Sequence, residues 1–299
     1  MVKHDGRTGT VLVGVDDTSH GWLAADWAAA EAELRGSTLR VVHAVHGITG
    51  AEVELVSEGA DRQVRDAAAA VLDEARARLA AGHPGLHVET VLARDHPAEA
   101  LLGAAEDADL LVVGTRGRGG FAGLLLGSVS LKLAAHATCP VVVVRGHAEK
   151  KAADGGIVVG VRDEHDENAV RFALAEAELL QAPVRLIHAW TPLVDTGRMI
   201  PQVSQVDEER KAHARVLNQA ARPVAEYPQV QVDMELVVGA PAALLVEASA
   251  GAGLLVLPRH PPAARLGLRL GAVVHAVLHH ATCPVAVVPV SWTSFEGGP

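Results

Sequence analysis

The feature that most constrains the fold of this chain is an internal duplication. The segment HATCPVVVV at residues 136–144 returns as HATCPVAVV at residues 280–288, with eight of the nine residues identical. Extended back without gaps to residues 114 and 258, the match covers 31 positions, of which 13 are identical. Self-similarity of this kind in a chain of 299 residues is typical of two tandem domains of ordinary size.

The beginnings of the two copies match as well. VLVGVDD at residues 11–17 corresponds to IVVGVRD at 157–163, and LRVVHAV at 39–45 corresponds to VRLIHAW at 184–190. The duplication therefore covers nearly the whole chain.

The segment between the copies, GHAEKKAADGG at residues 146–156, is polar and rich in Gly and Ala, as flexible connectors are. We predict a first domain at residues 1–147, a linker at 148–155 and a second domain at 156–299.

Within each copy, short apolar runs alternate with helical segments. The runs suit strands that are buried on both faces. Ser19 is placed to cap the first helix and Gly36 to end it, while Pro97 suits the first turn of a later helix. In the first copy we expect strands at 11–15, 39–45, 88–93, 110–113 and 141–144, and helices at 19–35, 53–81, from 97 onward and at 128–136.

Strands separated by helices imply parallel pairing with right-handed crossovers. The fold class is therefore α/β, with two tandem doubly wound domains, each a parallel sheet of about five strands with flanking helices. Ligands of such sheets bind beyond the carboxyl ends of the strands, at the switch point of the strand order.

A glycine-rich stretch follows the fourth predicted strand of the first copy. The segment GTRGRGGFAGLLLGSVS, residues 114–130, holds six glycines. Glycine can adopt a positive φ and lets backbone N–H groups approach a ligand closely. We expect this freedom to be used at Gly114, Gly117, Gly119 and Gly120.

The end of the same stretch adds polar groups that suit phosphate. Gly127 and Ser128 open a predicted helix, whose N-terminal N–H groups and dipole favour an anion. Ser128 adds a hydroxyl, and Arg116 and Arg118 add positive charge. Together these residues predict a phosphate site.

Two known phosphate motifs do not fit this stretch. A Walker loop carries Lys directly after its last Gly, whereas here Ser128 follows Gly127 and Lys132 comes four residues later. The dinucleotide fingerprint lies at the start of a βαβ unit, whereas this loop follows the fourth strand.

The pattern Gly114-x-x-Gly117, nine residues, then Gly127-Ser128 resembles the ATP-binding pattern of the universal stress proteins. The GVDDTS start, the HAV after the second strand and the TCPVVVV at the end fit the same family in order, and the resemblance covers both copies. It implies a Rossmann-like fold of the adenine nucleotide α-hydrolase type and ATP, with Mg²⁺, as the bound ligand.

The resemblance also implies contacts in the first copy. Asp16, at the end of the first strand, would face the adenine and ribose, and Ala44 would offer its backbone to the adenine edge. Val13 and Val15 are candidates to line the same pocket, and whether one of them points away is left open. The residues implied to wrap the ribose and phosphates are Gly114, Gly117, Gly127, Ser128 and Val129.

The second copy departs from this pattern. Pro258 and Pro261 replace Gly114 and Gly117, and proline has no N–H to donate and a fixed φ. Of the core pattern only Gly271 remains, because Ala272 replaces Ser128 and Arg162 replaces Asp16. We predict that the nucleotide site of the second copy is lost.

Other candidate sites are weaker. His275 and His279 have metal-ligand spacing on a predicted helix but no acidic residue or Cys nearby in sequence, so a solvated helix face is the better interpretation. Cys139 and Cys283 occupy equivalent repeat positions before buried strands and are expected in the core. RDEHDEN at 162–168 is expected to be a solvated loop and helix start. No nucleophile elbow or acid–base pair is evident.

Bulk properties exclude several classes of protein. A net charge of -10 argues against nucleic acid as the main partner. The sequence has no apolar run long enough to span a membrane and no apolar core in its first ten residues, so we expect neither a membrane protein nor a signal peptide. Two cysteines are too few for a disulfide framework, which favours the cytoplasm.

The predicted function is an ATP-binding, regulatory stress-response protein. Family members dimerise through their last strands, and here VVVVR and VAVVPV would pair within one chain as a pseudo-dimer; a homodimer of the whole chain is left open. The alternatives are an ATP hydrolase or nucleotidyl-transfer enzyme of related fold, and a nucleotide-free scaffold. Catalysis is left open, with slow ATP hydrolysis as its upper limit.

Overall fold

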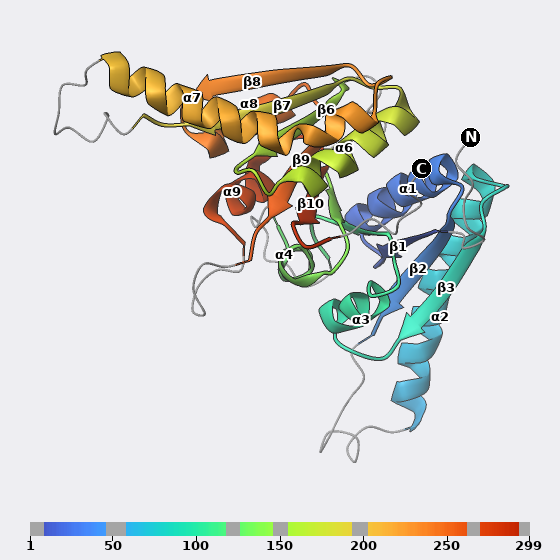
Figure 1. Cartoon of the computed structure of the whole chain (residues 1–299). Coiled ribbons are helices and arrows are strands. Elements are labelled where there is room, and N and C mark those ends of the chain that lie inside the picture. The colour runs from blue at the N-terminus through green and yellow to red at the C-terminus, as the bar shows by residue number, and fades with distance from the viewer. Residues whose placement is uncertain are drawn as a thin grey trace. The chain divides into compact units, whose positions relative to one another are not determined.

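The computed structural model describes residues 9–45, 58–117, 126–145, 155–192, 203–261 and 270–292. It divides into two compact units, which we call the first domain and the second domain (Figure 1). Strands β1 to β5 belong to the first domain and strands β6 to β10 to the second.

The first domain is a parallel sheet with the strand order β3-β2-β1-β4-β5. Because β1 lies between β2 and β4, the strand order reverses there, and this is the switch point of a doubly wound sheet. The strands are β1 (Thr10–Gly14), β2 (Thr38–Ala44), β3 (Val88–Ala93), β4 (Leu110–Gly114) and β5 (Val141–Val144), and the helices are α1 (Ser19–Arg35), α2 (Glu58–Gly82), α3 (Pro97–Ala104) and α4 (Ser128–His136).

The second domain repeats this order as β8-β7-β6-β9-β10, again with parallel pairing. Its strands are β6 (Ile157–Val161), β7 (Val184–Trp190), β8 (Val232–Val238), β9 (Leu254–Arg259) and β10 (Val285–Pro289). Its helical segments are α6 (Glu167–Leu180), α7 (Val203–Ala220), the 3₁₀ helix η3 (Arg222–Glu226), α8 (Pro241–Ser249) and α9 (Ala272–His280). The predicted fold class is confirmed.

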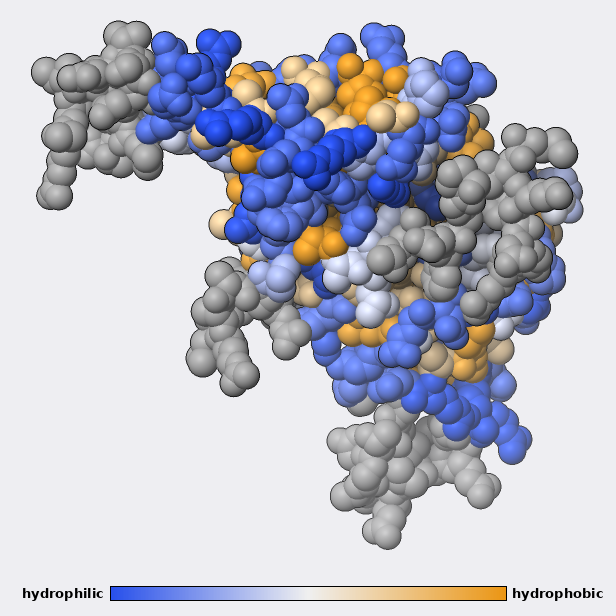
Figure 2. All heavy atoms as spheres, in the orientation of Figure 1, coloured by the Kyte–Doolittle hydropathy of each residue, from blue (hydrophilic) through white to orange (hydrophobic). Residues whose placement is uncertain are grey.

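The core of each domain is built from Val, Leu and Ala. Every residue of β4 and β5 is buried, as is every residue of β6 and β10. The charged helices α2 and α7 present a hydrophilic surface (Figure 2). Aromatic residues make up only 3% of the chain, so burial of aliphatic strands supplies most of the hydrophobic stabilisation.

The element bounds differ from the prediction in a few places. Thr18, not Ser19, is the N-cap of α1, because its side chain accepts a hydrogen bond from the Gly21 N–H, while Ser19 is the first helical residue. Gly36 ends α1 with a φ of 62°, as expected. β4 extends through Gly114, which we expected in the loop. The predicted start of α2 at residue 53 and most of the linker lie outside the described residues.

Candidate functional site

The first domain contains a cavity of about 700 Å³ where β1, β2 and β4 end. A volume of this size falls within the range of small-molecule sites. Its walls are mostly apolar, with polar groups from the strand ends and from the start of α4. Of the residues proposed from the sequence, nine line it: Val15, Asp16, Ala44, Gly114, Arg116, Gly117, Gly127, Ser128 and Val129.

The two remaining candidates are placed differently. Val13 is fully buried inside β1 and is not among the residues that line the cavity. Arg118 lies outside the described residues.

Asp16 connects the end of β1 to the start of α1. Its Oδ1 accepts hydrogen bonds from the backbone N–H of Thr18 at 3.2 Å and from the Thr18 hydroxyl at 2.5 Å. The same hydroxyl accepts from the Gly21 N–H at 3.2 Å. The carboxylate is therefore held in one orientation at the cavity wall by the helix cap.

Close packing is what requires glycine at the end of β4 and in the loop that follows it. A Cβ atom at Gly114 would lie 2.5 Å from the carbonyl oxygen of His20, and one at Gly117 would lie 2.7 Å from Asp16 Oδ2. Neither residue has a positive φ, so our expectation of positive φ was wrong for both. Gly119 and Gly120 lie outside the described residues.

The N-terminus of α4 also lines the cavity. Gly127 is its N-cap, and its N–H donates to the Thr115 carbonyl at 2.6 Å, which fixes the start of the helix against the end of β4. The Ser130 hydroxyl donates to the buried Gly114 carbonyl at 2.7 Å. These bonds aim the first turn of α4, with its N–H groups, into the cavity.

His43 lines the cavity and was missed by the sequence reasoning. The ring is 4% exposed, and its Nδ1 lies 2.8 Å from the Val15 carbonyl oxygen. Because a carbonyl only accepts, Nδ1 carries the proton. His188 makes the same contact with the Val161 carbonyl in the second domain, at 2.9 Å. The recurrence of HA in both copies was the available signal.

Arg116 extends from the loop after β4 and contacts α1. Its Nη2 lies 3.3 Å from His20 Nε2, and since a guanidinium only donates, the imidazole accepts there. Burial lowers the pKa of His20 below its ordinary value, and the charge of Arg116 lowers it further, whereas Asp16 opposes both effects. As a neutral imidazole, His20 therefore accepts a hydrogen bond from Arg116. Among the described residues of the glycine stretch, Arg116 is the one cation at this cavity.

The second domain has different groups at the matching strand ends. The buried positions of α1 and α6 correspond, with Ala24 matching Ala169 and Ala28 matching Ala173, and the same spacing places Asp166 where the first domain has Gly21. Asp166 is fully buried, so the prediction of a solvated loop at 162–168 was wrong for this residue.

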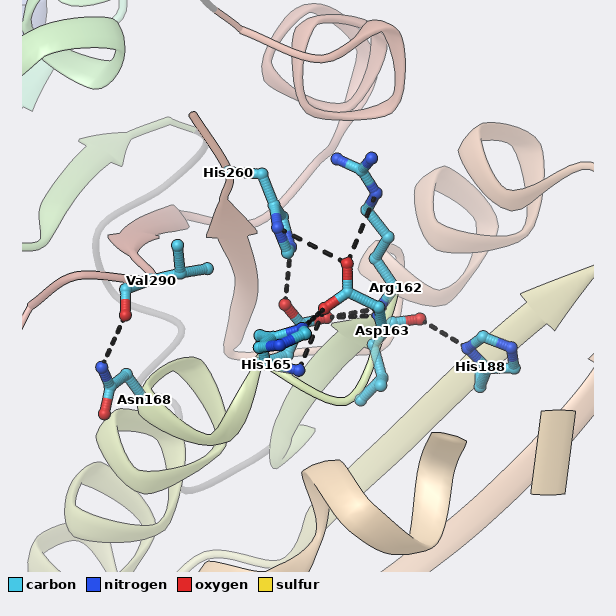
Figure 3. A network of polar contacts seen from close by, with 9 residues as sticks. Arg162, Asp163, His165, Asn168, His188, His260 and Val290 are labelled. Atoms are coloured by element: carbon cyan, nitrogen blue, oxygen red, sulfur yellow. Dashed lines mark hydrogen bonds and ion pairs between the residues drawn. The ribbon is translucent and has the colours of Figure 1, made fainter. Parts of the chain in front are cut away.

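The Asp166 carboxylate occupies the loop after β6. Its Oδ2 accepts from the backbone N–H of Arg162 at 2.6 Å and of Asp163 at 3.0 Å, and its Oδ1 lies 2.7 Å from His260 Nε2 (Figure 3). In the first domain Gly21 has no side chain, and Asp16 fills the matching space, since a Cβ atom at Gly21 would lie 2.5 Å from Asp16 Oδ1.

An aromatic stack also distinguishes the second domain. Trp190 stands where the first domain has the cavity-lining Val45, and it stacks on His213 of α7 with ring centroids 4.6 Å apart. His213 Nδ1 in turn lies 2.8 Å from His188 Nε2. Burial and the neighbouring His188 lower the pKa of His213. Bulky rings thus occupy the end of β7.

The two cysteines and the histidine pair of α9 were the other candidates from the sequence. Cys139 and Cys283 are buried, and neither forms a disulfide, as expected of core cysteines. The rings of His275 and His279 lie 4.5 Å apart on α9 and are partly exposed. Among the described residues, the groups of three or more metal-ligating side chains centre on Asp163 and do not include this pair.

Comparisons with known proteins agree with the duplicated fold. The model of the universal stress protein family matches residues 8–145 and again residues 156–289. A universal stress protein of Mycobacterium tuberculosis is 33% identical over 294 residues, which cover 95% of this chain and 97% of that protein. One from Mycolicibacterium smegmatis is 31% identical over 293 residues, covering 93% and 96%.

A solved structure shows the same arrangement of elements. The crystal structure of a universal stress protein from Archaeoglobus fulgidus aligns over 94% of this chain and 98% of its own, with a TM-score of 0.72 and 17% sequence identity. At that identity the similarity shows the fold. Within the part of the chain that is described, none of the helices has the length and apolar content needed to cross a lipid bilayer.

Proposed function

The chain belongs to the universal stress protein family as two tandem family domains, and we propose that it is a regulatory protein that binds one ATP, with Mg²⁺, in its first domain. The observation that carries the proposal is the cavity at the switch point of the first sheet. Its position is where open α/β sheets bind their ligands.

Two groups of residues at the cavity suit the two parts of ATP. Asp16 offers a fixed carboxylate, which can accept hydrogen bonds from a nucleoside. The end of β2 offers the backbone of Ala44, whose N–H can donate and whose carbonyl can accept. The start of α4 offers N–H groups and the Ser128 hydroxyl, and Arg116 offers a cation, all of which favour phosphate. The resemblance of the glycine pattern to that of ATP-binding family members supports the same orientation.

The second domain is proposed to be free of nucleotide. Pro258 and Pro261 cannot donate backbone hydrogen bonds, and the side chains of Asp166 and Trp190 stand at positions that are small in the first domain. This asymmetry predicts a stoichiometry of one nucleotide for each chain.

The deciding experiment denatures the purified protein and identifies any nucleotide that is released and its amount per chain. Calorimetric titration of the stripped protein with ATP and Mg²⁺ should then saturate at about one equivalent. Two equivalents would contradict the loss of the second site, and no binding would favour the nucleotide-free scaffold. Release of phosphate during the titration would favour the ATP hydrolase.

Two further properties are proposed for the protein, namely its location in the cell and the pairing of its two copies. We propose a cytoplasmic location, which suits two buried cysteines outside any disulfide. We also propose that the last strands of the two copies pair as in a family dimer. Measurement of the molecular mass in solution tests whether the whole chain also forms a homodimer.

A further inference from the structure

We propose that the second domain binds a divalent transition-metal ion such as Zn²⁺ between His260 and Asp163, with Asp166 as the residue that positions the histidine. The site lies where β6 and β9 end (Figure 3). It is independent of the nucleotide proposal, because all of its residues belong to the second domain.

Asp166 fixes the tautomer of His260. The carboxylate is fully buried, and two backbone N–H groups bind its Oδ2, so its Oδ1 is aimed at His260 Nε2 at 2.7 Å. An ionised carboxylate only accepts, so Nε2 carries a proton, and in the neutral imidazole Nδ1 then presents its lone pair. Donation of one ring N–H to a carboxylate is the usual arrangement of a metal-ligating histidine.

The other ring nitrogen of His260 lies near a second carboxylate. His260 Nδ1 lies 3.5 Å from Asp163 Oδ2, which is longer than an ordinary N–H···O bond. With the proton on Nε2, two acceptors face each other across this gap. Metal–nitrogen and metal–oxygen bonds of about 2.0 to 2.2 Å place two ligands about 3.4 Å apart at the tetrahedral angle. The observed separation therefore suits a shared metal ion.

The cluster is open to solvent on one side. The side chain of His260 is 13% exposed and that of Asp163 is 31% exposed, whereas Asp166 is closed off beneath them. The ligand atoms of these three residues all lie within 4.8 Å of one another. An ion can therefore enter from the solvent, and water can complete its coordination.

His165 is the candidate for a third ligand. Its Nδ1 lies 3.3 Å from Asp163 Oδ1, the other oxygen of the same carboxylate, and its side chain is 74% exposed. The exposed ring has room to rotate toward an ion held by Asp163. A set of imidazole and carboxylate ligands is one that Zn²⁺ accepts.

The first domain cannot form the same site. At the position of His260 in the repeat it has Arg116, which cannot ligate a metal, and at the position of Asp166 it has Gly21. The two copies therefore place different chemistry at the same end of the sheet. One copy has a cavity with a cation. The other has a histidine between two carboxylates, with Arg162 Nε 4.0 Å from Asp163 Oδ2.

The test titrates the full-length chain, treated with chelator and then freed of it, with Zn²⁺ alone against a chromophoric competitor. We expect His260→Ala and Asp163→Asn each to weaken one Zn²⁺ site at least tenfold. The matched control is the double variant His275→Ala, His279→Ala, which removes the histidine pair of α9 and should leave this site unchanged. Asp166→Asn should weaken the site by about 10- to 100-fold, as other changes to the partners of metal ligands do.

The proposal is overturned if His260→Ala and Asp163→Asn bind Zn²⁺ as tightly as the wild type. Ring resonances of His260 that do not respond to Zn²⁺ in NMR spectra would overturn it as well, and would assign the network to hydrogen bonding alone. Circular dichroism monitors the fold of each variant. Because Asp163 is partly exposed, Asp163→Asn decides the question even if Asp166→Asn fails to fold.

Discussion

Gly117 and Asp16 are packed so closely that neither position accepts a larger group without moving the other. A Cβ atom at residue 117 would lie 2.7 Å from Asp16 Oδ2, and Asp16 is itself held by two hydrogen bonds from Thr18. The loop after β4 and the end of β1 thus meet at this contact, 101 residues apart in the sequence and both at the cavity wall. We therefore expect a substitution at either residue to change the affinity for the ligand.

Gly117→Ala is expected to weaken ATP binding about tenfold, which corresponds to about 1.4 kcal/mol. The added methyl group displaces the Asp16 carboxylate or the loop itself. Gly117→Pro should weaken binding further, because it also removes the backbone N–H. Isothermal titration calorimetry measures both variants. Gly103→Ala in α3 is the matched control, since a Cβ there meets nothing within 4 Å, and wild-type affinity in Gly117→Ala would show that this glycine is only a turn residue.

Asp16→Arg is expected to weaken ATP binding by roughly tenfold to a thousandfold. The change removes an acceptor, worth about 0.5 to 1.5 kcal/mol, and fills space beside the base. The start of α4 with Ser128 is left intact, so residual binding should lose its preference for adenine. Competition between ATP and GTP measures this preference.

The control for that variant is Asp17→Arg, which makes the same change of charge at the exposed neighbouring residue. It should leave both affinity and preference close to the wild type. If Asp16→Arg keeps the preference for ATP, the base does not lie beside Asp16 and the proposed orientation of the nucleotide is wrong.

His43→Ala is expected to lower the stability of the first domain by roughly 1 to 3 kcal/mol. The substitution leaves the buried Val15 carbonyl without its donor and empties the space of the ring. His188→Ala removes the same contact from Val161 in the second domain, together with the contact to His213, and should cost at least as much. Only His43→Ala should also weaken ATP binding, as measured by calorimetry beside denaturant unfolding. Equal loss of ATP affinity in both variants would refute the assignment of the nucleotide to the first domain.

His20 should make stability depend on pH on the acid side of its ordinary pKa of 6.5. Its pKa is lowered in the folded state, so between the lowered value and 6.5 the unfolded chain binds more protons than the folded chain. Stability therefore falls as the pH drops through this window and is unaffected above it. Protonation also removes the acceptor for Arg116.

The measurement compares melting temperatures of the wild type and His20→Gln from neutral to mildly acidic pH. The difference between the two proteins should be constant above pH 6.5 and should move in favour of the variant below it. Both proteins share the other fifteen of the chain's sixteen histidines, so the contribution of those residues to the pH dependence cancels in the difference. A difference that does not change with pH would mean that His20 keeps its ordinary pKa in the folded protein.

The elements of the fold could be predicted closely because their signals are local. Pro97 begins a helix and Gly36 ends one, and the apolar runs at β3 and β5 have the bounds expected from their composition. Errors arose where two neighbouring residues offer the same chemistry. Thr18 and Ser19 both carry a hydroxyl, and only the path of the backbone decides which of them accepts from the Gly21 N–H.

The residues that line the cavity were predicted in part, for a related reason. The residues of one short motif, such as Gly114 and Ser128, are found by their spacing alone. His20 and His43 were missed because their roles depend on partners from other elements, namely Arg116 and the Val15 carbonyl. Spacing along the chain does not encode which side chain reaches across from a neighbouring strand or helix.

The sequence by itself determined that the chain is a duplicated α/β protein and that one copy lost its glycine pattern. Repeats and apolar runs are visible in the order of the residues, and proline restricts its own backbone, so these signals can be recognised without coordinates. Only the tertiary structure decided why Gly114 and Gly117 are glycine, and that Asp166 is buried against His260. These contacts join residues about 90 to 100 positions apart, and they exist because parallel pairing brings the ends of distant strands to one edge of the sheet.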